Sequence, residues 1–143
     1  MRVMVLVKAS KESEAESHPL DMEGAEEIFE QMGRFNEELI KAGIVLAGDG
    51  LKPSRFRKRI HFNGTKRSVT DGPFTESKEL VAGYWIWQVR SMEEAIEWAK
   101  RCPNPMPGPS DLEIRPIWEP EDFGVEMAAG VNELRAKIAK NTK

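Results

Sequence analysis

The stretch LVAGYWIWQV, residues 80–89, is the most hydrophobic strand-like segment of this 143-residue chain. Successive side chains of a strand point to opposite faces of a sheet. The alternation divides the stretch into two apolar sets: Val81, Trp85, Trp87 and Val89 on one face, and Leu80, Ala82, Tyr84 and Ile86 on the other. Because both faces are apolar, we expect a central strand that is covered from two sides.

A helix and a last strand are predicted downstream of this stretch. Ser91, with Glu94 three residues later, has the spacing of a capping box at a helix start, and Pro103 ends the helix. The apolar residues between them lie along one stripe: Met92, Ala95, Ile96, Ala99 and Cys102. Residues 112–118 then alternate as a strand, in which Pro116 lacks a backbone donor and favours a sheet edge or a bulge.

Three elements are predicted upstream. Residues 1–9 form a β-branched run with apolar side chains on both faces, which is typical of a second central strand. A helix is expected over residues 22–42, where apolar residues recur at steps of three and four: Ala25, Ile28, Met32, Phe35, Leu39 and Ala42. Residues 44–47 form a short apolar strand, which the turn-forming sequence Gly48-Asp49-Gly50 closes.

A hairpin and a C-terminal helix complete the pattern. Residues 56–62 alternate in a two-fold pattern, with Phe56, Ile60 and Phe62 on one face and Arg57, Arg59 and His61 on the other. The turn Asn63-Gly64 leads into a returning strand over residues 65–70. Near the C-terminus, apolar residues again follow a helical stripe: Met127, Val131, Leu134 and Ile138.

With the hairpin counted as an insertion, the order of elements is βαββαβ, which predicts an α+β domain of the ferredoxin-like kind. Both helices should then cover one face of a four-stranded antiparallel sheet, and the other face keeps apolar side chains. A second copy of the sheet is the simplest cover, and the C-terminal helix is the competing one. We expect a homodimer with one domain, residues 1–124, followed by an amphipathic helix, residues 125–143, that packs on the domain or on the dimer.

The composition is that of an ordinary globular protein, 40% hydrophobic and 31% charged, with a net charge of −3. We expect no general attraction for nucleic acid or membrane, and we see neither a signal-peptide core nor a run of bilayer length. The single cysteine, Cys102, can form no internal disulfide, which suits a cytoplasmic protein, and it excludes a multi-cysteine metal site. The pattern indicates no metal and no cofactor.

The strongest charge feature is the interval 52–67, which has seven basic residues and no acidic one: Lys52, Arg55, Arg57, Lys58, Arg59, Lys66 and Arg67. The favoured interpretation is a charged hairpin that resists edge-to-edge strand association. Contact with an acidic partner protein comes second. Nucleic-acid binding comes last, because the phenylalanines alternate to the face opposite most of the arginines.

The segment DGPFTESKE, residues 71–79, followed by Gly83-Tyr84-Trp85, resembles the signature of the YCII-related proteins of the DGPF type. The resemblance continues through residues 32–39, 47–51 and 119–124, and covers about residues 2–124. It implies a dimeric α/β barrel of two ferredoxin-like sheets, found in bacteria and often encoded near or fused to extracytoplasmic-function sigma factors. It implies no established reaction.

Some YCII-related proteins carry a histidine and aspartate pair that is proposed as catalytic, with the histidine on the first helix. The matching stretch of this chain has Arg34, Phe35 and Asn36, and no histidine. The resemblance therefore does not extend to acid–base catalysis by such a pair.

Several residues are candidates for a site. Asp71 could act as a base or anchor a ligand beside the aromatic strand, or it could close an Asx-type turn. Arg34 and Asn36 could point into a cleft, His61 could be a general base, and Lys78 could meet an anionic ligand; solvent-facing roles are the alternative for each. Tyr84 and Trp85 would supply an apolar wall.

These features lead to two hypotheses. The first is a protein that binds a small organic molecule in a dimer cleft, with an enzymatic role left open. The second is a regulatory module that contacts an extracytoplasmic-function sigma factor or a similar partner through the basic hairpin.

Overall fold

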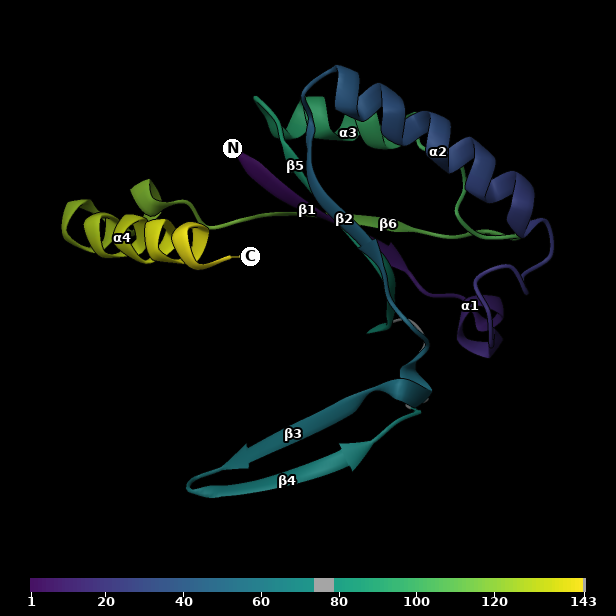
Figure 1. Ribbon diagram of the computed structural model, residues 1–143, viewed down its shortest axis with the longest axis horizontal. Coiled ribbons are helices and arrows are strands. Elements are labelled where there is room, and N and C mark those ends of the chain that lie inside the picture. The colour runs from purple at the N-terminus through teal and green to yellow at the C-terminus, as the bar shows by residue number, and fades with distance from the viewer. Residues whose placement is uncertain (74–78, 143) are drawn as a thin grey trace.

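The computed structural model describes residues 1–73 and 79–142. Its main sheet has the strand order β2-β5-β1-β6, formed by Val45–Gly50, Val81–Gln88, Arg2–Lys8 and Leu112–Pro116, and every neighbouring pair is antiparallel (Figure 1). The two doubly apolar strands, β1 and β5, are central, and β6, which ends at Pro116, is an edge strand. The α+β fold of the ferredoxin-like kind is thereby confirmed.

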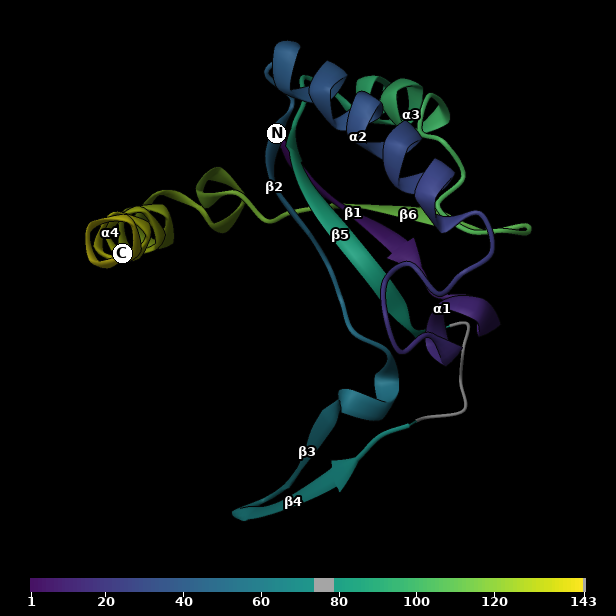
Figure 2. The same ribbon diagram turned by 45° about the vertical axis from the view of Figure 1, so that its right-hand side comes forward.

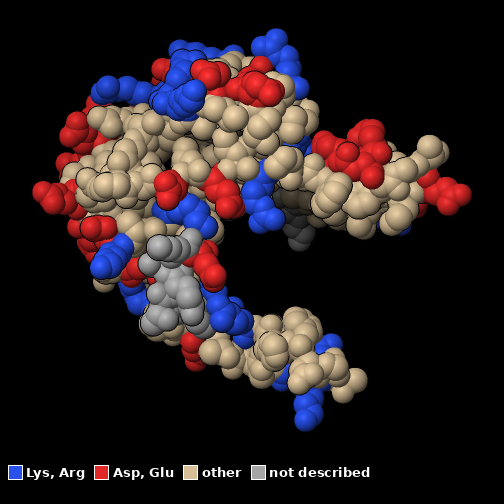
Figure 3. All heavy atoms as spheres, turned by 180° about the vertical axis from the view of Figure 1, so that it is seen from behind, with Lys and Arg blue, Asp and Glu red and all other residues tan. Residues whose placement is uncertain are grey.

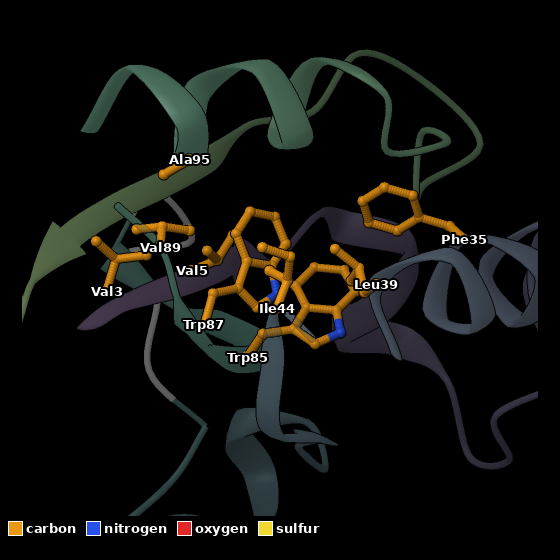
Figure 4. Close-up of a cluster of buried hydrophobic side chains, with 9 residues drawn as sticks. All are labelled: Val3, Val5, Phe35, Leu39, Ile44, Trp85, Trp87, Val89 and Ala95. Carbon is orange, nitrogen blue, oxygen red and sulfur yellow. The ribbon is translucent and has the colours of Figure 1, made fainter. Parts of the chain in front are cut away.

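Helices α2 (Ala25–Lys41) and α3 (Met92–Lys100) cover one face of the sheet (Figure 2). The core lies between these layers and consists of nine buried residues: Val3, Val5, Phe35, Leu39, Ile44, Trp85, Trp87, Val89 and Ala95 (Figure 4). The ring of Phe35 meets those of Trp85 and Trp87 edge to face, at centroid distances of 6.1 and 6.3 Å. These aromatic contacts fix α2 against the middle of the sheet.

No helix within residues 1–73 and 79–142 covers the other face of the sheet (Figures 1 and 2). By alternation from the buried side chains, Met4, Leu6, Tyr84 and Ile86 point to this face, and all four are half-buried. The face thus keeps the apolar surface that the sequence predicts.

Two arms leave the domain on this helix-free side (Figures 1 and 2). The hairpin arm consists of β3 (Lys58–Asn63) and β4 (Lys66–Asp71), which pair with each other in a separate two-stranded sheet. The C-terminal arm consists of the 3₁₀ helix η3 (Pro120–Phe123) and α4 (Val125–Asn141), and α4 has no buried residue. Within this chain, α4 therefore does not cover the sheet.

Some boundaries differ from those expected. Helix α2 begins at Ala25 because Gly24, with a φ of 71°, adopts a left-handed conformation that interrupts the helical pattern. The short helix α1 (Lys11–Ala15) was not predicted; Ser10 and Ser13 close a capping box around its first turn. Residues 48–50 extend β2 instead of turning, since they pair with β5.

The start of α3 agrees with the sequence in part. The Ser91 side chain accepts a hydrogen bond from the Glu94 N–H at 3.2 Å, as predicted. The Glu94 carboxylate, however, accepts from the N–H of Arg90 instead of that of Ser91, so the capping box is shifted by one residue. Arg90 also donates from its side chain to Glu94 at 2.6 Å, which explains the shift.

Candidate functional site

A cavity of about 790 Å³ lies between α2, the β2 edge of the sheet and the loop that precedes α2. Its volume falls within the range of sites for small molecules, which is roughly 300–1,000 Å³. Much of its wall is apolar and includes Ile28, Phe29, Met32, Ile40, Val45 and Leu51. The cavity could therefore receive a mainly apolar organic molecule.

Glycines shape the wall that the sheet contributes. Gly48, Gly50 and Gly83 all border the cavity. A Cβ atom on Gly48 would lie only 2.7 Å from Cδ1 of Trp85, so glycine at this position lets the indole approach β2 closely. A Cβ atom on Gly83 would lie 3.1 Å from the carbonyl oxygen of Asp49. The close approach of β2 and β5 thus depends on residues without side chains.

One polar group in this wall is held in a defined orientation. The indole Nε1–H of Trp85 donates to Oδ1 of Asn36 at 2.9 Å. Because the indole nitrogen can only donate, the amide oxygen of Asn36 must face it and the amide nitrogen must point elsewhere. Among the described residues, this nitrogen has no hydrogen-bond partner, and Asn36 lines the cavity. Asn36 can therefore donate to a bound molecule.

The lining of the cavity includes three residues with charged or titratable side chains, Glu16, His18 and Lys52. The carboxylate of Asp21 fixes this loop by accepting from the backbone N–H groups of Ser17 and His18, both at 2.8 Å, and these bonds lower the pKa of Asp21. Partial burial raises the pKa of Glu16, and the nearby Asp21 charge acts in the same direction.

His18 has a defined tautomer when it is neutral. Its Nδ1 accepts from the N–H of Leu20 at 3.1 Å, so Nε2 carries the proton. A second donor therefore lies at the wall of the cavity.

The base of the hairpin arm is tied to α1. The Glu14 carboxylate accepts from the backbone N–H of Ser54 at 3.0 Å and also from its hydroxyl. Arg55 donates to the carbonyl oxygens of Glu14, at 3.0 Å, and of Glu16. These contacts hold η1 (Ser54–Phe56), which leads into β3, beside the cavity, where Phe56 is a lining residue.

The structure brings together two of the residues singled out from the sequence, Asn36 and Trp85. Tyr84 contributes to the border of the same cavity, but alternation places its side chain on the opposite face, where its hydroxyl donates to Asp49 at 3.4 Å. Arg34 lies outside the cavity and pairs with Glu30 along the exposed side of α2.

The other candidates lie elsewhere. Asp71 pairs with Lys58 Nζ at 2.6 Å near the base of the hairpin arm, where both side chains are exposed. His61 lies in the hairpin arm beside Asn63 and Ser68, away from the cavity. Lys78 falls outside the described residues.

The cavity also includes residues that the sequence did not single out as site candidates, notably Glu16, His18 and Phe29, and it includes Lys52, which was noted only as part of the basic interval. A loop residue has no periodicity from which its position can be inferred, so Glu16 and His18 gave no signal. The glycines at residues 48, 50 and 83 were the available signal, because glycine in a strand often marks a close backbone approach.

The described part of the chain gives little support for a metal site, a reactive cysteine or a membrane-spanning helix. Residues 1–73 and 79–142 contain no group of three or more His, Cys, Asp or Glu residues arranged to hold a metal ion. Burial raises the pKa of the Cys102 thiol to about 12, so this thiol is a poor nucleophile at neutral pH. None of the helices in the same ranges is both long and apolar enough to cross a membrane.

Comparison with known proteins agrees with this architecture. An uncharacterized protein from Rhizobium meliloti (strain 1021) is 25% identical to this chain over 92 residues, which is 64% of this chain and 74% of that protein. The family model described as the YCII-related domain matches residues 1–120, which include the whole sheet and the cavity. The chain therefore belongs to the YCII-related family.

Proposed function

We propose that this protein binds a small organic molecule, mainly apolar and with at least one hydrogen-bond acceptor, in the cavity between α2 and the sheet. Asn36 carries the proposal, because its bond from Trp85 engages the amide oxygen and leaves the N–H₂ of a cavity-lining residue available as a donor, beside largely apolar walls. His18 offers a second donor at the same cavity. Such a site binds through apolar contact and selects through a few polar groups.

We further propose that the binding protein is a homodimer in the bacterial cytoplasm. The half-buried apolar side chains on the helix-free face support the dimer, because no helix among the described residues covers them. The bacterial relative and the single cysteine support the location.

The test is a thermal-shift screen of the purified protein against a broad panel of metabolites, with native mass spectrometry to find ligands that co-purify. Each hit is then measured against Asn36→Asp, which keeps an acceptor for the Trp85 indole but replaces the free N–H₂ by an oxygen. We expect the affinity to fall about tenfold or more, the loss of roughly one well-placed hydrogen bond.

Arg34→Gln is the matched control, since Arg34 lies on the same helix but outside the cavity. It should leave the affinity unchanged. A hit that binds Asn36→Asp and the native protein equally well would count against the site, and the absence of any hit or co-purified ligand would count against the function.

A second candidate is a regulatory module that contacts an extracytoplasmic-function sigma factor through the basic hairpin. The supporting observation is that every residue of β3 and β4 is exposed. Capture of a purified sigma factor by the native protein, and its loss on changing Arg57, Arg59 and Arg67 to Glu, would favour this candidate. Unchanged capture would remove the hairpin from consideration.

A further inference from the structure

The hairpin arm and the C-terminal arm project from the domain on its helix-free side without meeting each other (Figures 1 and 2). Seen from behind, the molecule is hollowed between them and has the shape of an open C (Figure 3). Both arms belong to the described residues, and each leaves apolar side chains exposed. Exposed apolar side chains on both arms indicate that another surface covers them.

The hairpin arm has one apolar face. Ile60 pairs with Val69, and Phe62 pairs with Arg67, so these four side chains share a face. The guanidinium of Arg67 lies 4.4 Å from the centroid of the Phe62 ring, so one arginine does share the phenylalanine face. Phe62 and Val69 are nevertheless each 66% exposed. An isolated two-stranded ribbon is at best marginally stable in water, so this face needs a partner.

The C-terminal arm has a matching apolar stripe. Met127, Leu134 and Ile138 follow one side of α4 at helical spacing, and each is about 60% exposed. The contacts that hold α4 come from the flank of the stripe, where Arg135 donates to the carbonyl oxygen of Trp118 at 3.2 Å and approaches Glu119 at 3.7 Å. In the part of the chain that the structure describes, these three side chains are therefore left exposed.

The hairpin arm is basic, and the first part of the C-terminal arm is acidic. Residues 52–67 contain seven basic residues and no acidic one. Residues 116–134, which end within α4, contain five acidic residues and no basic one: Glu119, Glu121, Asp122, Glu126 and Glu133. The last turns of α4 carry three basic residues: Arg135, Lys137 and Lys140. Opposite charge on two surfaces that both expose apolar side chains favours their association over contact with a like copy of either surface.

We propose that the hairpin arm of one copy docks on the C-terminal arm of a second copy, with the face of Ile60, Phe62 and Val69 against the stripe of Met127, Leu134 and Ile138. The inference rests on the proposed dimer. In a two-fold dimer the contact occurs twice, once for each hairpin. A contact within one chain would require closing the hollow between the arms.

A charge swap tests the contact. One variant reverses two charges of the hairpin, Lys66→Glu with Arg67→Glu, and the other reverses two charges of α4, Glu126→Lys with Glu133→Lys. Each variant alone places like charges at both contacts of its homodimer, so we expect the dissociation constant to rise about tenfold or more at low salt. A mixed dimer has opposite charges at both contacts, so the equimolar mixture should dimerise about as tightly as the native protein.

The measurement is sedimentation equilibrium with each variant alone and with the mixture. The control variant reverses two charges on the outer side of α2, Glu26→Lys with Glu37→Lys. Mixing it with either arm variant should not restore the dimerisation of that variant. Loss of dimer without rescue in the mixture would overturn the arm contact. Dimerisation of both variants as tight as that of the native protein would also overturn it, while leaving the dimer itself and the ligand site in place.

Discussion

At the scale of single residues, the two core tryptophans differ in how their indole nitrogens are satisfied. Trp85 donates to Asn36 at 2.9 Å, whereas the fully buried nitrogen of Trp87 has no hydrogen-bond partner among the described residues. A buried donor without a partner costs about 1–3 kcal/mol. Trp87 therefore contributes to stability through its apolar contacts alone.

This difference predicts unequal effects of replacing tryptophan by phenylalanine. Trp87→Phe removes the unsatisfied donor along with some packing, so we expect the free energy of unfolding to fall by less than about 1.5 kcal/mol. Trp85→Phe removes a satisfied bond and should cost about 1 kcal/mol more. Urea unfolding of both variants shows which of them loses more free energy of unfolding. Trp87→Ala, which should cost about 3–5 kcal/mol, is the reference for a large loss. A Trp87→Phe loss larger than that of Trp85→Phe would contradict the argument.

A second residue-scale prediction concerns acid. Arg2 donates to the Glu119 carboxylate through two nitrogens, at 3.0 and 2.7 Å, and these bonds hold the pKa of Glu119 below its ordinary value of 4.5. A lowered pKa in the folded state stabilises the fold above pH 4.5, and the contribution is lost as the pH falls through the folded-state pKa.

Glu119→Gln should therefore reduce the free energy of unfolding at pH 7 by up to about 1 kcal/mol, a modest value because the pair is partly exposed. The difference from the native protein should shrink as the pH is lowered below 4.5. Denaturant titrations at neutral and acid pH measure it. A difference that stays constant across this range would exclude the ion pair as its source.

The sequence could predict only part of the candidate site, and the reason is geometric. Arg34 and Asn36 flank the buried Phe35 on either side of the helical stripe, and the helical period cannot tell which flank faces the sheet edge. The structure turns Asn36 inward to Trp85 and leaves Arg34 outside, paired with Glu30. Such a choice depends on how the helix crosses the sheet, which only the assembled layers determine.

At the scale of elements, packing explains why the DGPF segment has a glycine, Gly72, at its second position. A Cβ atom at Gly72 would lie 1.8 Å from the carbonyl oxygen of Ser54, and the Gly72 N–H donates to the carbonyl oxygen of Arg57 at 2.8 Å. The chain that leaves β4 therefore passes directly against η1. No other amino acid fits without moving the base of the hairpin arm.

Gly72→Ala should accordingly lower the free energy of unfolding by about 2 kcal/mol or more, because the obstructing atom belongs to the backbone. Gly33→Ala is the matched control, since a Cβ atom there meets nothing within 4 Å and the position is inside α2. Its helix propensity should raise stability by about 0.5–1 kcal/mol. Thermal melts compare the two, and equal effects of both substitutions would contradict the steric argument.

The elements themselves were predictable where the local pattern was strong. The central strands β1 and β5 were identified because apolar residues occupy both of their faces, and the hairpin because Asn63-Gly64 favours a two-residue turn. Helix α1 was missed, since its five residues, KESEA, have no apolar stripe. The sequence could not predict that the hairpin leaves the main sheet. The pattern of residues that pair within a hairpin is the same whether or not the hairpin joins a larger sheet.

At the scale of the whole molecule, the decisive feature is the helix-free face of the sheet. Leu6, Tyr84 and Ile86 point to it and are half-buried, while α4, the competing cover, has no buried residue. Leaving each such apolar side chain in water forgoes up to about 1.5–3 kcal/mol, which is large beside a typical net stability of roughly 5–15 kcal/mol. A second copy of the chain would recover this free energy.

We therefore predict that sedimentation equilibrium at micromolar concentration gives twice the chain mass of 16.2 kDa, and that Leu6→Lys returns it to 16.2 kDa. The Leu6 side chain lies on the helix-free face of β1, away from the core that the helices cover. A lysine there can therefore reach solvent in the monomer, but in the dimer it would place a charge inside a sheet-to-sheet interface. Ile96→Lys on the helix layer is the control and should remain dimeric, since Ile96 is already 39% exposed on α3. A native mass of 16.2 kDa would refute the dimer and assign the cover to α4, which would then have to fold back over its own sheet.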